Sequence, residues 1–170
     1  MATTYEKIAT VTVGSGGASS IDFTSIPSTY KDVVVKLSSR TASGGASDVL
    51  IQFNTDSTSG NYSERQIQGA GSGTPGSGTG NQQSATSSGS TDTASTFANS
   101  EIYVPNYAGS TAKSYSVDSV TENNATTAYA TLRAGLWTGT AAINAIKLTH
   151  NGGASFAQYS SATLYGIKNS

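Results

Sequence analysis

The sequence predicts an all-β protein, an antiparallel β-sandwich of jelly-roll type with one long Gly/Ser-rich loop. Short segments alternate strictly between apolar and polar residues, which is the pattern of strands with one buried face. Glycine supplies 19 of the 170 residues, and most of it lies between these segments, where turns form. No long amphipathic helix pattern interrupts them, so two sheets packed face to face are expected.

The alternation begins near the N-terminus. Residues 5–13 place Ala9, Val11 and Val13 on one face, and residues 21–23 form a short second segment after a Gly-rich turn. The same pattern predicts further strands over residues 32–40, 49–53, 101–105, 113–121, 128–137, 146–148, 155–159 and 162–168.

Three local features depart from this pattern of alternating strands or add to it. In the 113–121 segment, Val117 and Val120 fall on opposite faces, which indicates a bulge. The Asn-Gly dipeptide at 151–152 favours a hairpin turn. Residues 62–67 are too few to classify.

Residues 69–99 contain almost no large apolar side chain. Such a segment cannot supply a core, and structureless loops of this length are uncommon inside compact domains. We therefore expect a low-complexity loop that is inserted between strands and is either disordered or held by a partner.

Length and composition limit the organisation and the partners. We expect residues 1–170 to form a single domain, and the absence of Cys excludes disulfides and thiolate metal sites. The formal net charge is -1, and only 11% of the residues are charged. The sequence shows no basic patch, no apolar run of membrane-spanning length and no signal peptide, so neither nucleic acid nor a membrane is expected as a partner.

The residues that could carry catalysis are few and scattered. His150 is the single histidine, and its place at a strand end predicts a rim or surface side chain. No Gly-x-Ser-x-Gly segment lies on a strand-to-helix turn, so a serine nucleophile is not indicated. Acidic residues occur singly, and we interpret each as solvated charge, although folding could bring two together: Asp48, Asp56, Glu64, Asp92, Asp118 and Glu122. We expect no enzyme and no catalytic residue.

Metal and cofactor motifs are also weak. Residues 54–60 resemble a calcium loop, but Gly60 comes one place late and Arg65 stands where a bidentate Glu is needed. We predict an Asx turn there, with a loose calcium site as the alternative. The glycines of 69–80 lack the Lys-Ser/Thr ending of a phosphate-binding loop, so we expect no cofactor and no metal.

Aromatic residues carry the one binding signal. Nine tyrosines outnumber four Phe and one Trp, and tyrosine is suited to surfaces that are partly apolar and partly wet. Tyr103 and Tyr107 flank a Pro-Asn pair at a strand end, and Trp137 ends another strand. We predict these three as contacts to a partner protein or a glycan.

Several segments resemble small β-sandwich structural proteins of tailed phages, of the kind found in cyanophages and marine phages. The segments are IDFTSIPSTYKD at 21–32, VVVKL at 33–37, FNTD at 53–56, NYS at 61–63 and ATLYGIK at 162–168. The resemblance covers most of the chain outside 69–99 and contains no catalytic signature. It implies jelly-roll modules that assemble as homo-oligomers, often trimers, on a capsid or tail after synthesis in the host bacterial cytoplasm.

Two functions follow as expectations. The first is a capsid decoration or cement protein that binds the major capsid protein, or another virion protein, and stabilises the head. The alternative is a tail or head-fibre adhesion module that binds host-surface glycan. A polysaccharide hydrolase ranks below both, because no acid-base pair is evident.

Overall fold

The computed structural model describes residues 4–70, 76–80, 82–124 and 128–168. One sheet contains β1 (Tyr5–Thr12), β3 (Asp32–Ser39), β5 (Tyr62–Ala70), β6 (Gly76–Gly80), β8 (Ala98–Val104), β9 (Lys113–Val120), β10 (Tyr129–Trp137) and β12 (Ser161–Ile167). The other contains β2 (Ile21–Phe23), β4 (Ser47–Phe53), β7 (Gln83–Ser87) and β11 (Ile146–His150). The short 3-10 turns are η1 (Ser59–Asn61) and η2 (Asn151–Gly153), and no helix in the described residues could cross a membrane.

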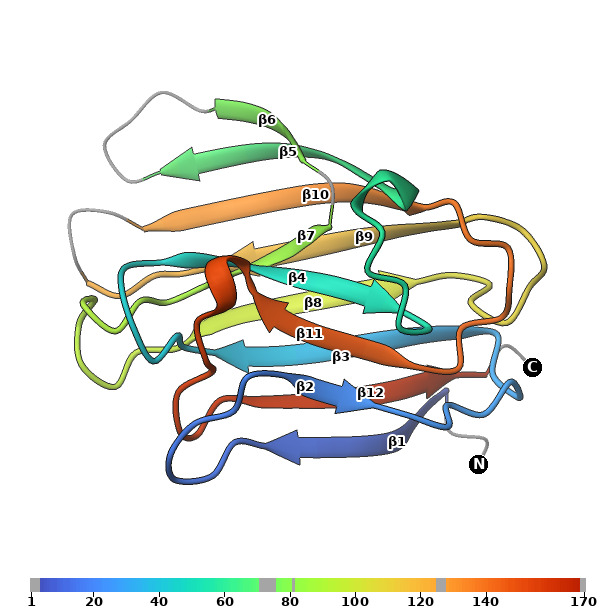
Figure 1. Ribbon diagram of the computed structural model, residues 1–170, viewed down its shortest axis with the longest axis horizontal. Coiled ribbons are helices and arrows are strands. Elements are labelled where there is room, and N and C mark those ends of the chain that lie inside the picture. The colour runs from blue at the N-terminus through green and yellow to red at the C-terminus, as the bar shows by residue number, and fades with distance from the viewer. Residues whose placement is uncertain (1–3, 71–75, 81, 125–127, 169–170) are drawn as a thin grey trace.

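The two sheets are antiparallel and pack face to face, so the predicted β-sandwich is confirmed (Figure 1). The larger sheet runs β1-β12-β3-β8-β9-β10-β5-β6, and the smaller runs β2-β11-β4-β7. Within these orders lie the two four-stranded sheets of a jelly roll. One is β1-β12-β3-β8, and the other, which packs against it, is β2-β11-β4-β7. The pairs β5–β6 and β9–β10 are insertions into this scheme, and both extend the larger sheet beyond β8.

The core lies between the sheets and is made by the inward-facing residues of both. Its aromatic centre is Phe53, whose ring centroid lies 5.6 Å from those of both Tyr115 and Trp137. Tyr62 stacks on Trp137 with a centroid separation of 6.5 Å. The fully buried aliphatic residues around these rings include Val33, Val35, Val49, Ile51, Ile102, Val104, Val117, Leu148 and Leu164.

The predicted loop over 69–99 is the largest error of the sequence analysis, because this segment contains β6 and β7. In β6 the glycines are opposite polar residues of β5: Gly80 pairs with Glu64, and Gly78 pairs with Gln66. A Cβ on Gly80 would lie 2.5 Å from Glu64 Oε2 and closer still to Gln83 Oε1, so a larger residue there would require both side chains to move. The residues of β6 do alternate between the two faces of the sheet. Because they are only Gly, Ser and Thr, the two faces do not differ in hydrophobicity, and the alternation could not be recognised in the sequence.

Residues 88–97 are ordered by hydrogen bonds from inside the domain, whereas we expected this part of the loop to be either disordered or held by a partner. The Arg40 guanidinium donates hydrogen bonds to four backbone carbonyls of this segment, those of Ser90, Asp92, Thr93 and Thr96, at 2.9 to 3.1 Å. One planar cation therefore satisfies carbonyl groups that would otherwise need water. Residues 71–75 and 81, also part of the predicted loop, lie outside the described residues.

Two smaller predictions also fail. Residues 155–159 form no strand: Phe156 makes single bridges to Ala18 and Thr41, and Tyr159 turns the chain at φ 73°. The expected bulge in β9 is absent, because its pairing with β8 and β10 is regular. Val120 is simply an apolar residue on the outer face, where 39% of its surface is exposed.

We predict that Arg40→Lys loosens residues 88–97. A lysine cannot reproduce four forked hydrogen bonds, and each bond to a charged group is worth roughly 1.5–3 kcal/mol. We expect the free energy of unfolding to fall by about 2 kcal/mol and amide exchange in 88–97 to rise, measured by urea titration and hydrogen-exchange mass spectrometry. Arg65→Lys is the matched control, because Arg65 is exposed; unchanged exchange in Arg40→Lys would contradict the assignment.

Candidate functional site

The three predicted contact residues do not form a surface. Tyr107 is fully buried and its hydroxyl donates to the carbonyl of Pro27, and Trp137 is 3% exposed. Tyr103 is half-buried and donates from its hydroxyl to Asp32 Oδ2 at 2.9 Å. The prediction of exposed contacts is therefore wrong for Tyr107 and Trp137, because β10 turns Trp137 to the core and Tyr107 fills the core beyond the end of β8.

The segment that resembled a calcium loop is an Asx turn, as predicted. Asp56 Oδ1 accepts the N–H of Thr58 at 3.0 Å, and Oδ2 accepts from Asn61 Nδ2 at 2.9 Å. Oδ2 also accepts from Trp137 Nε1 at 2.8 Å. These donors, that of Trp137 first, lower the pKa of Asp56 to about 2. The carboxylate fixes the loop and the indole together, so its role is structural.

His150, which we predicted at the rim of the core or on the surface, is buried. It is 2% exposed, and its ring lies 4.3 Å from that of Phe156. Neither ring nitrogen has a hydrogen-bond partner among the described residues. Burial lowers the pKa of His150 to about 4, so the imidazole is neutral at ordinary pH.

Folding does bring two of the scattered carboxylates together, at Arg133 of β10. Arg133 NH2 lies 2.5 Å from Asp48 Oδ1 and donates to Thr86 Oγ1 at 3.3 Å. Its NH1 lies 3.7 Å from Glu64 Oε1, and both Arg133 and Glu64 are almost fully buried. Burial raises the pKa of Glu64, and the Arg133 charge opposes that rise. Both carboxylates are thus paired with one guanidinium.

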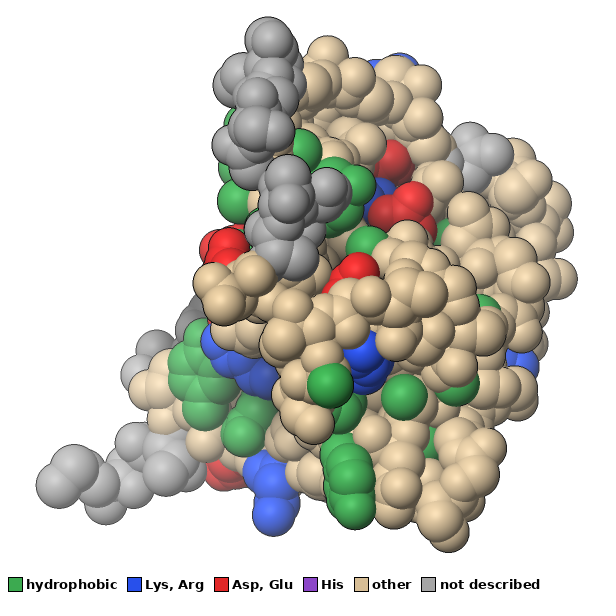
Figure 2. Space-filling view, turned by 90° about the vertical axis from the view of Figure 1, so that its left-hand side faces the viewer, with side chains coloured by type: hydrophobic (Ala, Val, Ile, Leu, Met, Phe, Trp, Pro, Cys, Tyr) green, Lys and Arg blue, Asp and Glu red, His purple; other side chains and the backbone are tan. Residues whose placement is uncertain are grey.

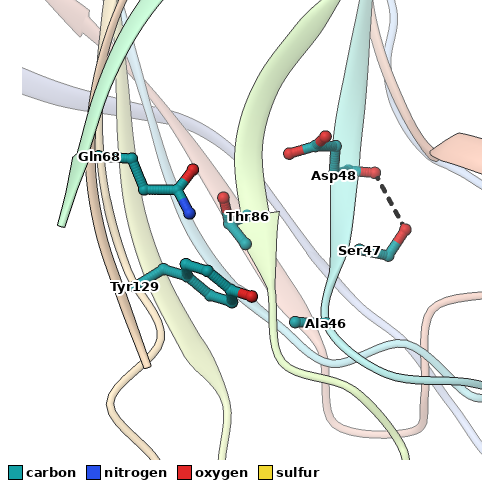
Figure 3. A pocket seen from close by; sticks show the side chains of 6 residues that line it. All are labelled: Ala46, Ser47, Asp48, Gln68, Thr86 and Tyr129. Carbon is teal, nitrogen blue, oxygen red and sulfur yellow. Dashed lines mark hydrogen bonds between the residues drawn. The ribbon is translucent and has the colours of Figure 1, made fainter. Parts of the chain in front are cut away.

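A hollow of about 200 Å³ opens beside this cluster, between the two sheets. We call it the polar cleft, and it is lined by Ala46, Ser47, Asp48, Gln68, Thr86 and Tyr129. Figure 3 shows the amide of Gln68 and the phenol of Tyr129 on one side, with Thr86 and the carboxylate of Asp48 facing them from the other strands. The hydroxyl of Ser47 points away from them, toward the backbone carbonyl of Asp48. Figure 2 shows acidic and basic side chains together in a hollow at this end of the molecule.

The opposite face of the same strands is apolar. Leu132 and Ile67 are direct cross-strand partners, and they are 53% and 61% exposed. Ala130 and Val120 form the next pair along β10 and β9. We call these four residues the apolar patch, and hollows of about 340 and 490 Å³ adjoin it. Apolar side chains gather at the upper left of Figure 2, on the side of the larger sheet.

Neither surface was found from the sequence. Residues 62–67, which we left unclassified, are most of β5. This strand alternates with Glu64 and Gln66 inward and with Arg65 and Ile67 outward. The available signal was that alternation, but nothing local says which face is covered. The arrangement offers hydrogen bonding on one side and apolar contact on the other.

Comparison with family models, with curated proteins and with solved structures gives no match to this chain. The resemblance to phage virion proteins therefore remains a hypothesis.

We predict that Asp56→Asn lowers stability by about 2 kcal/mol, because the hydrogen bonds to the carboxylate lose their charge. The folded pKa of about 2 lies below the ordinary 3.8, so the contribution of Asp56 is complete above pH 4 and is lost as pH falls toward 2. The Asp56→Asn variant should not show this loss of stability between pH 4 and pH 2. The free energy of unfolding is measured at each pH by urea titration followed by Trp137 fluorescence. Asp118→Asn, at an exposed position, is the control; equal acid sensitivity in both variants would contradict the assignment.

We predict a second, separate acid transition from His150. Its folded pKa of about 4 lies below the ordinary 6.5, so the unfolded state takes up a proton first and stability falls as pH drops from 6.5 to 4. The loss should reach about 3 kcal/mol. His150→Phe should abolish this part of the stability–pH profile. A profile for the variant that parallels the wild type over this range would show that His150 is not its source.

Proposed function

We propose that the protein is a non-enzymatic structural component of a tailed-phage virion, and that it decorates the capsid by binding the major capsid protein. The observation that carries the proposal is the apolar patch. Ile67 and Leu132 are large apolar residues, paired with each other and more than half exposed. A contiguous apolar area rimmed by polar residues is typical of a protein-binding surface.

The surroundings of the patch fit this role. Outward-facing residues of β9 near it include Ser116 and Asp118, and Arg65 lies beside it on β5. Apolar residues at the centre with polar and charged residues at the rim are the usual anatomy of an interface. The hollows beside Ile67 and Leu132 could receive apolar side chains of the partner.

The jelly-roll topology supports the virion setting by analogy only, because viral capsid proteins and lectins share it. The resemblance of residues 21–37 and 162–168 to phage proteins adds to this support. On this proposal the chain is made in the bacterial cytoplasm and functions on the particle, where its low charge lets many copies lie close together without strong repulsion.

Self-association is part of the proposal, with a trimer as the expected state. The β6 edge of the larger sheet supports it, because Gly76–Gly80 carries neither charge nor proline and so leaves strand addition open. The β1 edge differs, since it carries Glu6 and Lys7 and an irregularity in pairing after Lys7. The alternative function, adhesion to a host glycan, can no longer use Tyr107 and Trp137 as contacts, because both residues are buried in the core. It now depends on the polar cleft.

We predict that Ile67→Asp weakens binding to capsid shells at least tenfold, because a charge would be buried against an apolar partner surface. The measurement is co-sedimentation of purified protein with expanded heads that lack it. Folding should be unaffected, since Ile67 is exposed.

The control is Tyr159→Asp, a change at a residue 69% exposed and outside the patch. Wild-type protein should bind stoichiometrically, and antibody label should cover the whole head in electron micrographs of intact virions. Label only on the tail or fibres would replace decoration with adhesion. Absence of label from every particle would overturn the virion proposal itself.

A further inference from the structure

The larger sheet overhangs the smaller one, and the inner face of the overhang is polar. Beyond the edge strand β7, the larger sheet continues with β10, β5 and β6 (Figure 1). On the inner face, Gln68 is opposite Thr131 and Gln66 is opposite Arg133. Tyr129 precedes this row on β10. The glycines of β6, which pair with the glutamines of β5, add no side chain to this face.

This row contains buried polar atoms without partners. Thr131 is 3% exposed, and its Oγ1 has no hydrogen bond among the described residues; the same holds for Gln66 Oε1 and Arg133 Nε. Buried polar side-chain atoms are normally paired, and clusters of exceptions require an explanation. None of these three residues lines the polar cleft. They show that the inner face beside the cleft is polar and incompletely paired, and the ligand is inferred from the residues that do line it.

The opposite wall of the cleft is fixed in place. Asp48 and Thr86 are cross-strand partners on β4 and β7, and Arg133 donates to both. Ser119 Oγ in β9 contacts the backbone of Thr86, accepting from its N–H at 3.0 Å and donating to its carbonyl at 3.3 Å. The side chains around the cleft are thus preorganised before any ligand arrives.

The chemistry of the lining selects the class of ligand. Amides and hydroxyls both donate and accept, which matches the hydroxyl groups of a sugar, and Tyr129 supplies an aromatic ring for its apolar face. An anion is disfavoured, because Asp48 and Glu64 are both acidic and already engage Arg133. The hollow of about 200 Å³ is smaller than most ligand pockets, which suits one or two sugar rings with the rest of the chain outside.

We propose that the polar cleft is a binding site for an uncharged glycan, held by Gln68, Thr86 and Tyr129 with Asp48 as acceptor. This goes beyond a decorating role and does not depend on it, because the cleft and the apolar patch lie on opposite faces of β5 and β10.

The test is an array of neutral oligosaccharides built from hexoses, deoxyhexoses and N-acetylhexosamines, followed by titration calorimetry of the hits with full-length protein. We expect at least one neutral glycan to bind, and its uronic acid counterpart to bind at least tenfold more weakly. Gln68→Ala and Tyr129→Ala should each weaken binding of the neutral glycan at least fivefold.

The matched controls are Gln52→Ala and Tyr159→Ala, a glutamine and a tyrosine that do not line the cleft; both should bind as the wild type does. Urea titration of every variant shows whether it is folded. A blank array, stronger binding of the charged glycan, or undiminished binding by folded Gln68→Ala and Tyr129→Ala would each overturn the proposal. Capsid binding is measured separately, so failure of one proposal leaves the other intact.

Discussion

Arg133 connects the overhanging part of the larger sheet to the edge of the smaller one, and both candidate surfaces depend on this connection. Arg133 lies in β10, and its guanidinium pairs with Asp48 of β4 and Glu64 of β5, two consecutive strands that belong to different sheets. A buried cation of this kind contributes little net stability when paired, but removing one partner leaves an uncompensated charge. The cluster therefore fixes the position of the two sheets relative to each other, while burial of apolar surface in the aromatic core around Phe53 stabilises the fold.

One sheet has eight strands and the other has four. This difference explains why β5 and β10 carry polar residues on the inner face and apolar residues on the outer face. In a matched sandwich, the inner face of β5 and β10 would be covered and apolar. Here the smaller sheet ends at β7. Near Tyr62 and Trp137 the inner face of β5 and β10 still belongs to the aromatic core. Near Gln68 the inner face carries glutamines, and the outer face carries Ile67 and Leu132. The usual relation between side-chain polarity and sheet face is reversed in the overhang, and each reversed face exposes groups that would be satisfied by a ligand or a partner.

The sequence was informative where alternation had hydrophobic contrast and uninformative where it did not. The strands from Val33 to Leu37 and from Val49 to Phe53 were predicted because large apolar residues recur at every second position, with Lys36 and Gln52 between them. The strand Gly76–Gly80 was missed because glycine and serine differ little in hydropathy. The cluster at Arg133 could not be predicted, because the strand order that joins Asp48 to Glu64 is set by long-range pairing. Tyr107 and Trp137 were wrongly predicted as surface contacts for a related reason. An aromatic residue near a strand end can lie either in the core or on the surface, and the local sequence does not distinguish the two.

The placement of the two surfaces has a consequence for how they could work together. Because successive residues of a strand point to opposite faces, Gln66 and Gln68 face the cleft while Ile67 between them faces outward. Docking through the apolar patch would therefore hold β5 and β10 from behind and leave the cleft open to solvent. A protein seated on a particle in this way would present its cleft at the rim of the domain. The two surfaces would then be formed by opposite faces of the same two strands.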